Sequence, residues 1–134
     1  MVKRGFFIAM NKTVWIKIIA LSGALSVAMG AFAAHGLDGI LSPRYMDTFR
    51  TAVLYQFLHS LGILGILCLP EQLLHSRRQE WVARSFLLGI ILFSGSLYAL
   101  VFTGISALGV ITPLGGTAFI IGWGLLFFSV KPQD

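Results

Sequence analysis

Long apolar stretches separated by short polar ones dominate the pattern along this chain. Four such stretches lie at approximately residues 14–34, 51–69, 81–103 and 108–130. Each comes near the roughly 20 apolar residues that a helix needs to cross a bilayer. The pattern therefore predicts an all-α fold, a four-helix transmembrane bundle in which residues 1–134 form a single membrane domain.

Two prolines mark where helices should begin. Ser42 and Pro43 form a common helix start, with serine as the N-cap and proline in the first turn. The second helix then begins before its apolar stretch, so its polar start, residues 43–50, is expected to lie at the membrane interface. Pro113 similarly predicts the first turn of the last helix.

The composition excludes a soluble protein. Hydrophobic residues make up 57% of the chain, charged residues make up 11%, and the mean hydropathy is +0.87. Soluble domains carry charge on about a quarter of their residues, so the expected surrounding of this chain is the lipid bilayer. The single cysteine, Cys68, excludes an internal disulfide and a multi-cysteine metal site.

The net charge of +5 comes from basic residues at the ends of the apolar stretches, where they orient helices rather than bind nucleic acid. In a four-span arrangement, both termini and the middle loop share one side of the membrane. That side holds eight basic residues, Lys3, Arg4, Lys12, Lys17, Arg77, Arg78, Arg84 and Lys131. The other side holds only Arg44 and Arg50, so both termini are expected to be cytoplasmic.

The N-terminus allows two further interpretations. An Ala-Phe-Ala run ending at Ala33 fits a signal-peptide cleavage site, but the apolar stretch before it is long for a signal and includes Lys17. We therefore expect an uncleaved first helix. Met10 would make a conventional start just before the first span, so residues 1–9 are either a disordered extension or lie outside the native protein.

Small residues form faces on several predicted helices, and such faces mark close helix contacts in lipid. The first helix has a small face and an opposite face of large residues, which we expect to meet lipid. The small face consists of Ala20, Gly23, Ala24, Val27, Gly30, Ala31 and Ala34, and the large face of Leu21, Leu25, Met29 and Phe32. The fourth helix has a comparable row, Gly115, Ala118, Gly122 and Ser129. The expected helix-packing positions are Gly23, Gly30, Gly89, Gly115 and Gly122.

The third predicted helix carries small or polar residues on two faces. The first face has Ser85, Gly89, Ser96 and Thr103, and the second has Ser94 and Tyr98. A helix with two such faces has two neighbours, either inside the bundle or across a subunit interface.

Polar side chains gather on one face of the otherwise apolar second helix. Thr48, Thr51, Tyr55, Gln56, His59 and Gly62 fall within roughly 140° of arc. They occupy the outer half of the helix, where polar residues of the other three helices are also expected. The sequence thus predicts a polar cluster made of His35, Tyr55, Gln56, His59, Ser94, Tyr98 and Thr112.

Two interpretations of this cluster stay open. It is either an interhelical hydrogen-bond network or a small polar cavity, open to the outer side, that binds a ligand or partner. Ser94 and His59 have no acidic residue at their depth to complete a hydrolase site. His35 and His59 have no matched histidine or carboxylate within the membrane for haem or metal ligation. We therefore predict no catalytic residue, no metal and no cofactor.

Four strings of the sequence resemble a known family. They are GALSVAMGAFAAHGL (23–37), TAVLYQFLHSL (51–61), LFSGSLYAL (92–100) and GVITPLGGTAFIIGW (109–123), and the resemblance spans roughly residues 12–130. The chain resembles the YgdD-like family, the domain of unknown function numbered 423, which includes vertebrate transmembrane protein 256. That family usually has a glycine where this chain has Ala34. The resemblance implies a small four-helix protein of the bacterial inner membrane, without an established activity.

The expected function is that of a non-enzymatic inner-membrane protein, an accessory or scaffold that acts through helix–helix contacts. The small-residue faces exceed what so short a chain needs, which favours a homo-oligomer or a larger membrane complex. The alternative is a small transporter or ligand-binding membrane protein that uses a polar cavity in the outer half of the membrane. No nucleic acid partner is expected.

Overall fold

The structure, a computed structural model, describes residues 10–133, and all of its regular elements are helices. They are α1 (Lys12–His35), α2 (Pro43–Cys68), α3 (Ser76–Gly89), the π-helical turn η1 (Ile90–Ser94), α4 (Gly95–Thr103), the 3₁₀ helix η2 (Ser106–Val110) and α5 (Thr112–Ser129). Four segments are long and apolar enough to cross a membrane, namely Lys12–His35, Pro43–Cys68, Ser76–Thr103 and Ser106–Ser129. The predicted all-α, four-helix transmembrane fold is confirmed. The expectation about residues 1–9 lies outside the described residues.

Local sequence chemistry sets where the helices begin and end. The Ser42 side chain accepts a hydrogen bond from the N–H of Tyr45 at 3.3 Å, and Pro43 follows in the first turn of α2. Pro113 lies in the first turn of α5. Both proline predictions are thus confirmed. Gly104 ends α4 with φ of 69°, the left-handed conformation that glycine adopts most easily.

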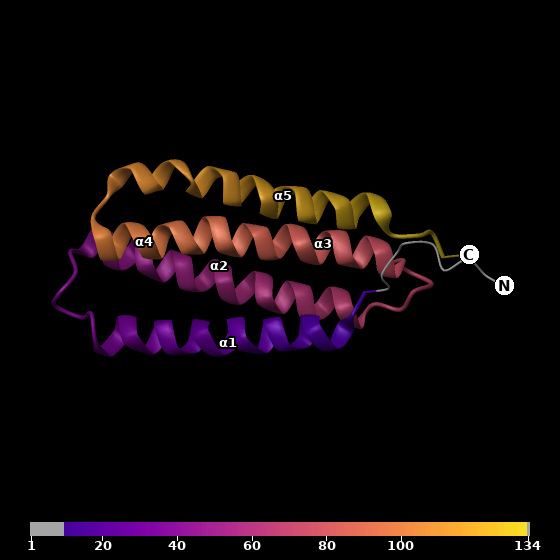
Figure 1. Ribbon diagram of the computed structural model, residues 1–134, viewed down its shortest axis with the longest axis horizontal. Helices are drawn as coiled ribbons and strands as arrows, with labels where there is room; N and C mark the ends of the chain where they lie inside the picture. Colours follow the sequence, from indigo (N-terminus) through magenta and orange to yellow (C-terminus); the bar gives the residue numbers. More distant parts are fainter. Residues whose placement is uncertain (1–9, 134) are drawn as a thin grey trace.

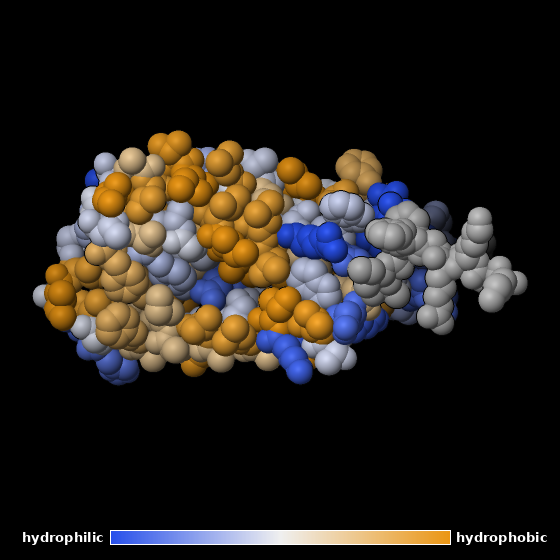
Figure 2. Space-filling view, viewed as in Figure 1, coloured by the Kyte–Doolittle hydropathy of each residue, from blue (hydrophilic) through white to orange (hydrophobic). Residues whose placement is uncertain are grey.

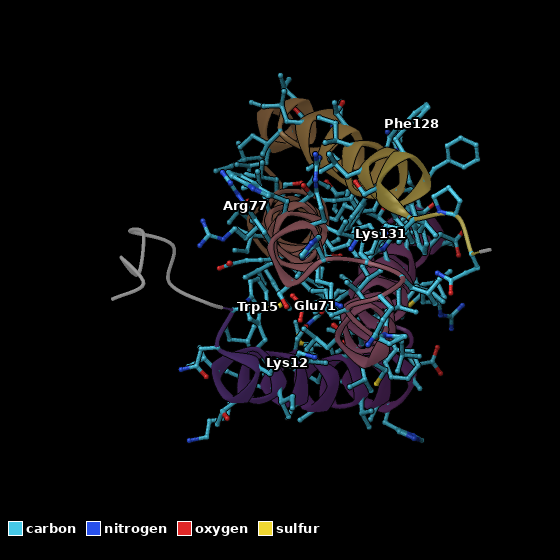
Figure 3. The ribbon with its side chains drawn as sticks, turned by 90° about the vertical axis from the view of Figure 1, so that its right-hand side faces the viewer. Lys12, Trp15, Glu71, Arg77, Phe128 and Lys131 are labelled. Atoms are coloured by element: carbon cyan, nitrogen blue, oxygen red, sulfur yellow. The ribbon has the colours of Figure 1, made fainter. Side chains whose placement is uncertain are left out.

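The spanning segments lie side by side and run antiparallel (Figure 1). The start of α1, the connection between α2 and α3 and the end of α5 lie at one end of the bundle. The connections at residues 36–42 and 104–111 lie at the other end, which we call the distal end. The main contacts join α1 to α2, α2 to α3 and α3 to α5. Seen end-on, α1 and α5 lie on opposite sides of the bundle, so α2 and α3 are central (Figure 3).

Two apolar clusters fill the interior. One joins all four spans through Trp15, Ile63, Phe86 and Phe119. The other lies toward the distal end around Phe49, which is fully buried. Helix association in lipid depends strongly on van der Waals packing, and these two clusters supply such packing between the spans.

The surface of the bundle has the character of a membrane protein. Apolar side chains cover much of the middle of the face in Figure 2, and hydrophilic ones gather mostly toward the end that holds the α2–α3 connection. Phe128, which is 85% exposed, projects from α5 away from the bundle (Figure 3). An apolar belt between polar ends is the surface that a bilayer covers.

Glycines allow α5 to approach the third span closely. A Cβ at Gly115 would lie only 2.7 Å from the Cα of Phe93 in η1. A Cβ at Gly89 or Gly122 would likewise overlap a phenylalanine ring of the opposite helix. These three glycines therefore lie at close contacts, where small residues let the two backbones meet.

The face of α1 that packs differs from the expected one. The buried residues of α1 are Trp15, Ile19, Ser26 and Ala33. Most of the expected small face is exposed instead. We call its exposed members the α1 strip, which consists of Ala20, Ala24, Val27, Ala31 and Ala34.

Because a different face of α1 is buried, the prediction that Gly23 and Gly30 are close-packing positions is wrong within this chain. In the described part of the chain, nothing lies within 4 Å of a Cβ added at Gly23, and a Cβ at Gly30 would make only an ordinary 3.6 Å contact with Val53. Neither glycine is a close-approach position within this chain. The reason is that the neighbouring face of α1, which carries Trp15 and Ile19, packs into the apolar interior instead.

Candidate functional site

Gln56, in the middle of α2, joins three helices through hydrogen bonds. Its Nε2 donates to the Ser22 carbonyl of α1 at 3.1 Å, and its Oε1 accepts from the Tyr98 hydroxyl of α4 at 2.7 Å. Ser60 extends the network, because its hydroxyl donates to the Gln56 carbonyl at 2.6 Å and lies 2.8 Å from the Ser22 hydroxyl. We call these four residues the Gln56 network. Gln56 and Ser60 are buried, so the network satisfies polar groups that lipid could not.

His59, on the next turn of α2, lies in an aromatic pocket. Phe119 stacks on its imidazole with ring centres 3.6 Å apart, and Phe86 meets the ring edge-on at 5.1 Å. The Trp123 indole N–H donates to Nε2 at 3.2 Å, and Nδ1 lies 2.9 Å from the Tyr55 carbonyl. An indole can only donate and a carbonyl can only accept, so these partners select the neutral imidazole with its proton on Nδ1. Both ring nitrogens are then occupied, which leaves no lone pair free for a metal ion.

Two further hydrogen bonds join the third span to its neighbours. The Ser94 hydroxyl donates to the Ala52 carbonyl of α2 at 2.7 Å. The Ser96 hydroxyl lies 2.7 Å from the Thr112 hydroxyl of α5. The two polar faces expected on the third helix therefore meet two neighbours inside the bundle.

Within the part of the chain that the structure describes, two members of the expected polar cluster form no side-chain hydrogen bond, although the ring of Tyr55 stacks near that of His59 with ring centres 5.9 Å apart. The His35 side chain is exposed and forms no hydrogen bond, ion pair or ring contact among residues 10–133. It lies two residues after the buried Ala33, about 200° around α1, and therefore faces away from α2. Tyr55 packs its ring on Phe93 with ring centres 4.5 Å apart. Its side chain is 37% exposed, and within the same described residues its hydroxyl has no hydrogen-bond partner.

The structure thus divides the expected cluster into separate contacts. Gln56 meets Tyr98, and His59 meets the backbone of Tyr55, while Ser94 and Thr112 belong to other bonds. Among residues 10–133, no group of three or more His, Cys, Asp or Glu side chains is placed to hold a metal ion. The chemistry that these buried residues support is hydrogen bonding between helices.

A groove of about 540 Å³ opens at the distal end between α2, the third span and α5. We call it the distal groove, and it is lined by Arg44, Asp47, Thr48, Thr51, Phe93, Leu97 and Thr112. Arg44 and Asp47 lie three residues apart on one face of α2, and in the described part of the chain they form no ion pair. Neither Gln56 nor His59 lines this groove. The charged groups open to a ligand therefore lie at the start of α2.

Sequence reasoning missed several residues of the site, Phe86 among them. Ser22 and Ser60 complete the Gln56 network, and Phe119 and Trp123 enclose the histidine. Ser60 carried a usable signal, because it follows Gln56 by four residues and so lies on the same face of α2. The aromatic residues carried none, since such residues are common in membrane helices whether they face lipid or protein.

Comparison with known proteins confirms the resemblance found in the sequence. The family described as "Protein of unknown function (DUF423)" matches residues 29–116. A UPF0382 membrane protein of Haemophilus influenzae is 43% identical over 128 residues, which cover 92% of this chain and 98% of that protein. The UPF0382 membrane protein YwdK of Bacillus subtilis is 44% identical over 110 residues, which cover 82% of this chain and 89% of that protein. No solved structure matches. The chain is therefore a member of the DUF423 family, a family of membrane proteins whose function is not known.

Proposed function

We propose that this membrane protein is a non-enzymatic scaffold or accessory protein that acts through helix–helix contacts and pairs with a second copy of itself. The observation that carries the proposal is the exposed α1 strip. In an apolar stretch of 18 residues within α1, 17% of the residues are buried, against 39% in a stretch of the same length within α2. Small residues at helical spacing let a partner's backbone approach closely, which is a common way for membrane helices to associate.

The space beside the α1 strip also suits a partner helix. A hollow of about 320 Å³ with mostly apolar walls lies between α1 and α2. Val27, Gly30 and Ala34 form much of its α1 wall, and Leu54 and Phe57 lie on the α2 side. A second copy of α1 in this position would cover the strip and gain dispersion contacts that the single chain lacks.

Cysteine cross-linking in native membranes tests the proposed pairing. In a Cys68→Ala background, Ala24→Cys and Ala31→Cys should each give a disulfide-linked dimer after mild oxidation. Leu25→Cys and Phe32→Cys are matched controls, because these residues lie at nearly the same depth and are also exposed, but on another face of α1. We expect dimers from the strip positions and little product from the controls.

Equal cross-linking from both faces would contradict the proposal, because it would indicate random collision in the membrane. Failure to cross-link at both strip positions would contradict it as well. Where the strip positions do cross-link, native mass analysis of the purified product would show whether the partner is a second copy or another membrane protein.

The non-enzymatic part of the proposal is supported by how the buried polar groups are used. The Gln56 amide and both nitrogens of His59 are occupied by other groups of the chain. Ser94 donates to a backbone carbonyl and has no histidine beside it in the contacts of the described residues. Catalysis by a serine or histidine needs these groups to be free for a substrate.

Ligand binding or transport is a second candidate function, which the distal groove favours. Its volume of about 540 Å³ is within the range of small-molecule pockets. In a Cys68→Ala background, a cysteine at Thr51 should react with a small water-soluble thiol reagent from the distal side. A cysteine at Ala52, which is fully buried next to it, is the control and should not react. A Thr51→Cys protein as unreactive as that control would contradict an open groove.

The proposed location is the plasma membrane of a bacterium, with both termini in the cytoplasm. The relatives' description as membrane proteins supports the membrane itself. The basic residues support the orientation, since they concentrate on the loops and ends that would face the cytoplasm.

A further inference from the structure

The distal groove contains two opposite charges that no described residue of the chain pairs. Arg44 and Asp47 lie on the same side of the first two turns of α2, at the Cβ separation of roughly 5–6 Å typical of residues three apart in a helix. Among residues 10–133, neither side chain forms an ion pair or a side-chain hydrogen bond. The groove thus offers a cation and an anion, side by side, to a ligand.

The threonines of the groove add acceptors rather than donors. The Thr48 hydroxyl donates a hydrogen bond to the Arg44 carbonyl at 2.9 Å, and the Thr51 hydroxyl donates one to the Asp47 carbonyl at 2.9 Å. Each oxygen keeps acceptor capacity after its proton is used. Together with the Asp47 carboxylate, these oxygens require a ligand group that carries several N–H donors. A primary ammonium, with three, meets that requirement.

We propose that the distal groove binds the headgroup of a phospholipid that carries a phosphate and a primary amine, as phosphatidylethanolamine does. The Arg44 guanidinium donates to the phosphate oxygens. The ammonium, two carbons away from the phosphate ester oxygen, donates to the Asp47 carboxylate and to the threonine oxygens. This inference rests on the second candidate function, ligand binding at the distal groove, and is independent of pairing through α1.

The position of the groove favours a lipid over a soluble molecule. Its charged residues lie in the first two turns of α2, where the polar start of that helix is expected to meet the headgroup region. Its apolar lining lies deeper, because Phe93 is ten residues, or about 15 Å along the helix, from the end of the third span at Thr103. Phe93 and Leu97 line the groove at the depth where the acyl chains of a lipid begin.

The direct test is lipid retention measured by native mass spectrometry. The purified full-length protein in detergent is mixed with phosphatidylethanolamine, phosphatidylcholine or phosphatidylglycerol that share the same acyl chains. We expect phosphatidylethanolamine to be retained about fivefold more than either of the others. The choline group has no N–H donor for Asp47 and the threonines, and the glycerol headgroup has no cation for Asp47.

Two variants and one control assign the charges. Asp47→Asn should reduce retention of phosphatidylethanolamine to the level of phosphatidylcholine, because the ammonium loses its carboxylate partner. Arg44→Gln should reduce retention of phosphatidylethanolamine and of phosphatidylcholine, because the phosphate that they share loses its guanidinium partner. Arg50→Gln is the matched control, because Arg50 is a cation on the same part of α2 that lines the hollow beside α1 instead of the distal groove. It should leave the preference unchanged. Circular dichroism and the resistance to unfolding by sodium dodecyl sulfate, both of which should be unaltered, show that each variant is folded.

Several results would overturn the proposal. One is equal retention of the three lipids, and another is an Asp47→Asn protein that still prefers phosphatidylethanolamine. A third is displacement of the lipid by an equal concentration of free phosphoethanolamine, which would make the ligand a soluble headgroup compound. If the preference fails while Thr51→Cys stays reactive, the lipid is wrong but the ligand-binding groove stands. If Thr51→Cys is unreactive, the groove itself is wrong.

Discussion

Gln56 shows how one polar side chain can join several membrane helices. Its amide bonds to α1 through Ser22 and to α4 through Tyr98. Interhelical hydrogen bonds in membranes contribute roughly 0.6–2 kcal/mol each, while an unpaired amide in an apolar environment costs several kcal/mol. The amide therefore favours the one arrangement of α1, α2 and α4 that satisfies it. We infer that the Gln56 network sets the rotation of α1 about its axis.

Replacing His59 tests the hydrogen bonds of the aromatic pocket. We expect His59→Leu to lower the free energy of unfolding by roughly 1–3 kcal/mol, because the indole N–H of Trp123 loses its acceptor. His59→Gln should retain more of the stability, since an amide oxygen can accept that bond. Unfolding of the detergent-solubilised protein with increasing sodium dodecyl sulfate measures both.

The same substitution in a Trp123→Phe protein isolates how much the hydrogen bond from Trp123 contributes to the free energy of unfolding. In a Trp123→Phe protein the donor is absent, so His59→Leu should cost less than it does in the wild type. The difference between the two costs is the coupling energy of the pair. Identical costs in the two backgrounds would show that stacking on Phe119, and not the hydrogen bond, holds the histidine.

At the scale of elements, the helix starts were predictable and the packing face of α1 was not. Ser42, Pro43 and Pro113 act through local backbone chemistry, so their effect can be derived from the sequence alone. Small residues mark close contacts in lipid but do not say whether the contact is within one chain or between two. Gly115 and Gly23 look alike in sequence, yet only Gly115 lies against another helix.

The π-helical turn η1 also lay beyond sequence reasoning. Its hydrogen bonds reach one residue further than those of an α-helix, and its residues, Ile90–Ser94, are ordinary for a membrane helix. The turn places the backbone of Phe93 directly against Gly115, and Phe93 also lines the distal groove. This irregular element therefore links the contact between two helices to the candidate ligand site.

A pair of glycine substitutions tests the close contact between the third span and α5. Gly115→Ala should lower the free energy of unfolding by roughly 1–3 kcal/mol or more, because its Cβ would overlap the backbone of Phe93. Gly23→Ala should be neutral or slightly stabilising, since no described residue lies within 4 Å of the added Cβ and alanine has the higher helix propensity. The same detergent unfolding assay compares them. Equal effects at the two positions would contradict the assigned contacts.

For the whole molecule, the chain order and the charge pattern lead to the same topology. The structure places the start of α1, the α2–α3 connection and the end of α5 at one end of the bundle (Figure 1). Five of the eight basic residues assigned to that side lie in or beside these segments and Arg84 lies about two turns into α3, while Lys3 and Arg4 lie outside the described residues. The number of spans and the side that carries the basic residues were both predictable, because composition and charge act on whole segments. The side-by-side order of the helices was not, because it depends on which faces pack.

Reporter fusions test this topology directly. Basic residues near the ends of spanning helices are retained in the cytoplasm, so fusions near His75 or after Asp134 should give a cytoplasmic signal. Fusions near Gly39 and Ala107, in the two distal connections, should give an outer-side signal. A cytoplasmic signal at Ala107 together with an outer signal after Asp134 would mean that the last span is inverted, which the antiparallel packing of α5 on the third span does not allow.

Moving basic residues from one end of the bundle to the other should also change the orientation of the protein in the membrane. Replacing Arg77 and Arg78 with glutamine while adding lysines beside Gly39 should increase the fraction of inverted molecules. The glutamine changes alone should have a smaller effect, because Lys12 and Arg84 still add positive charge toward the end of the bundle that is proposed to face the cytoplasm.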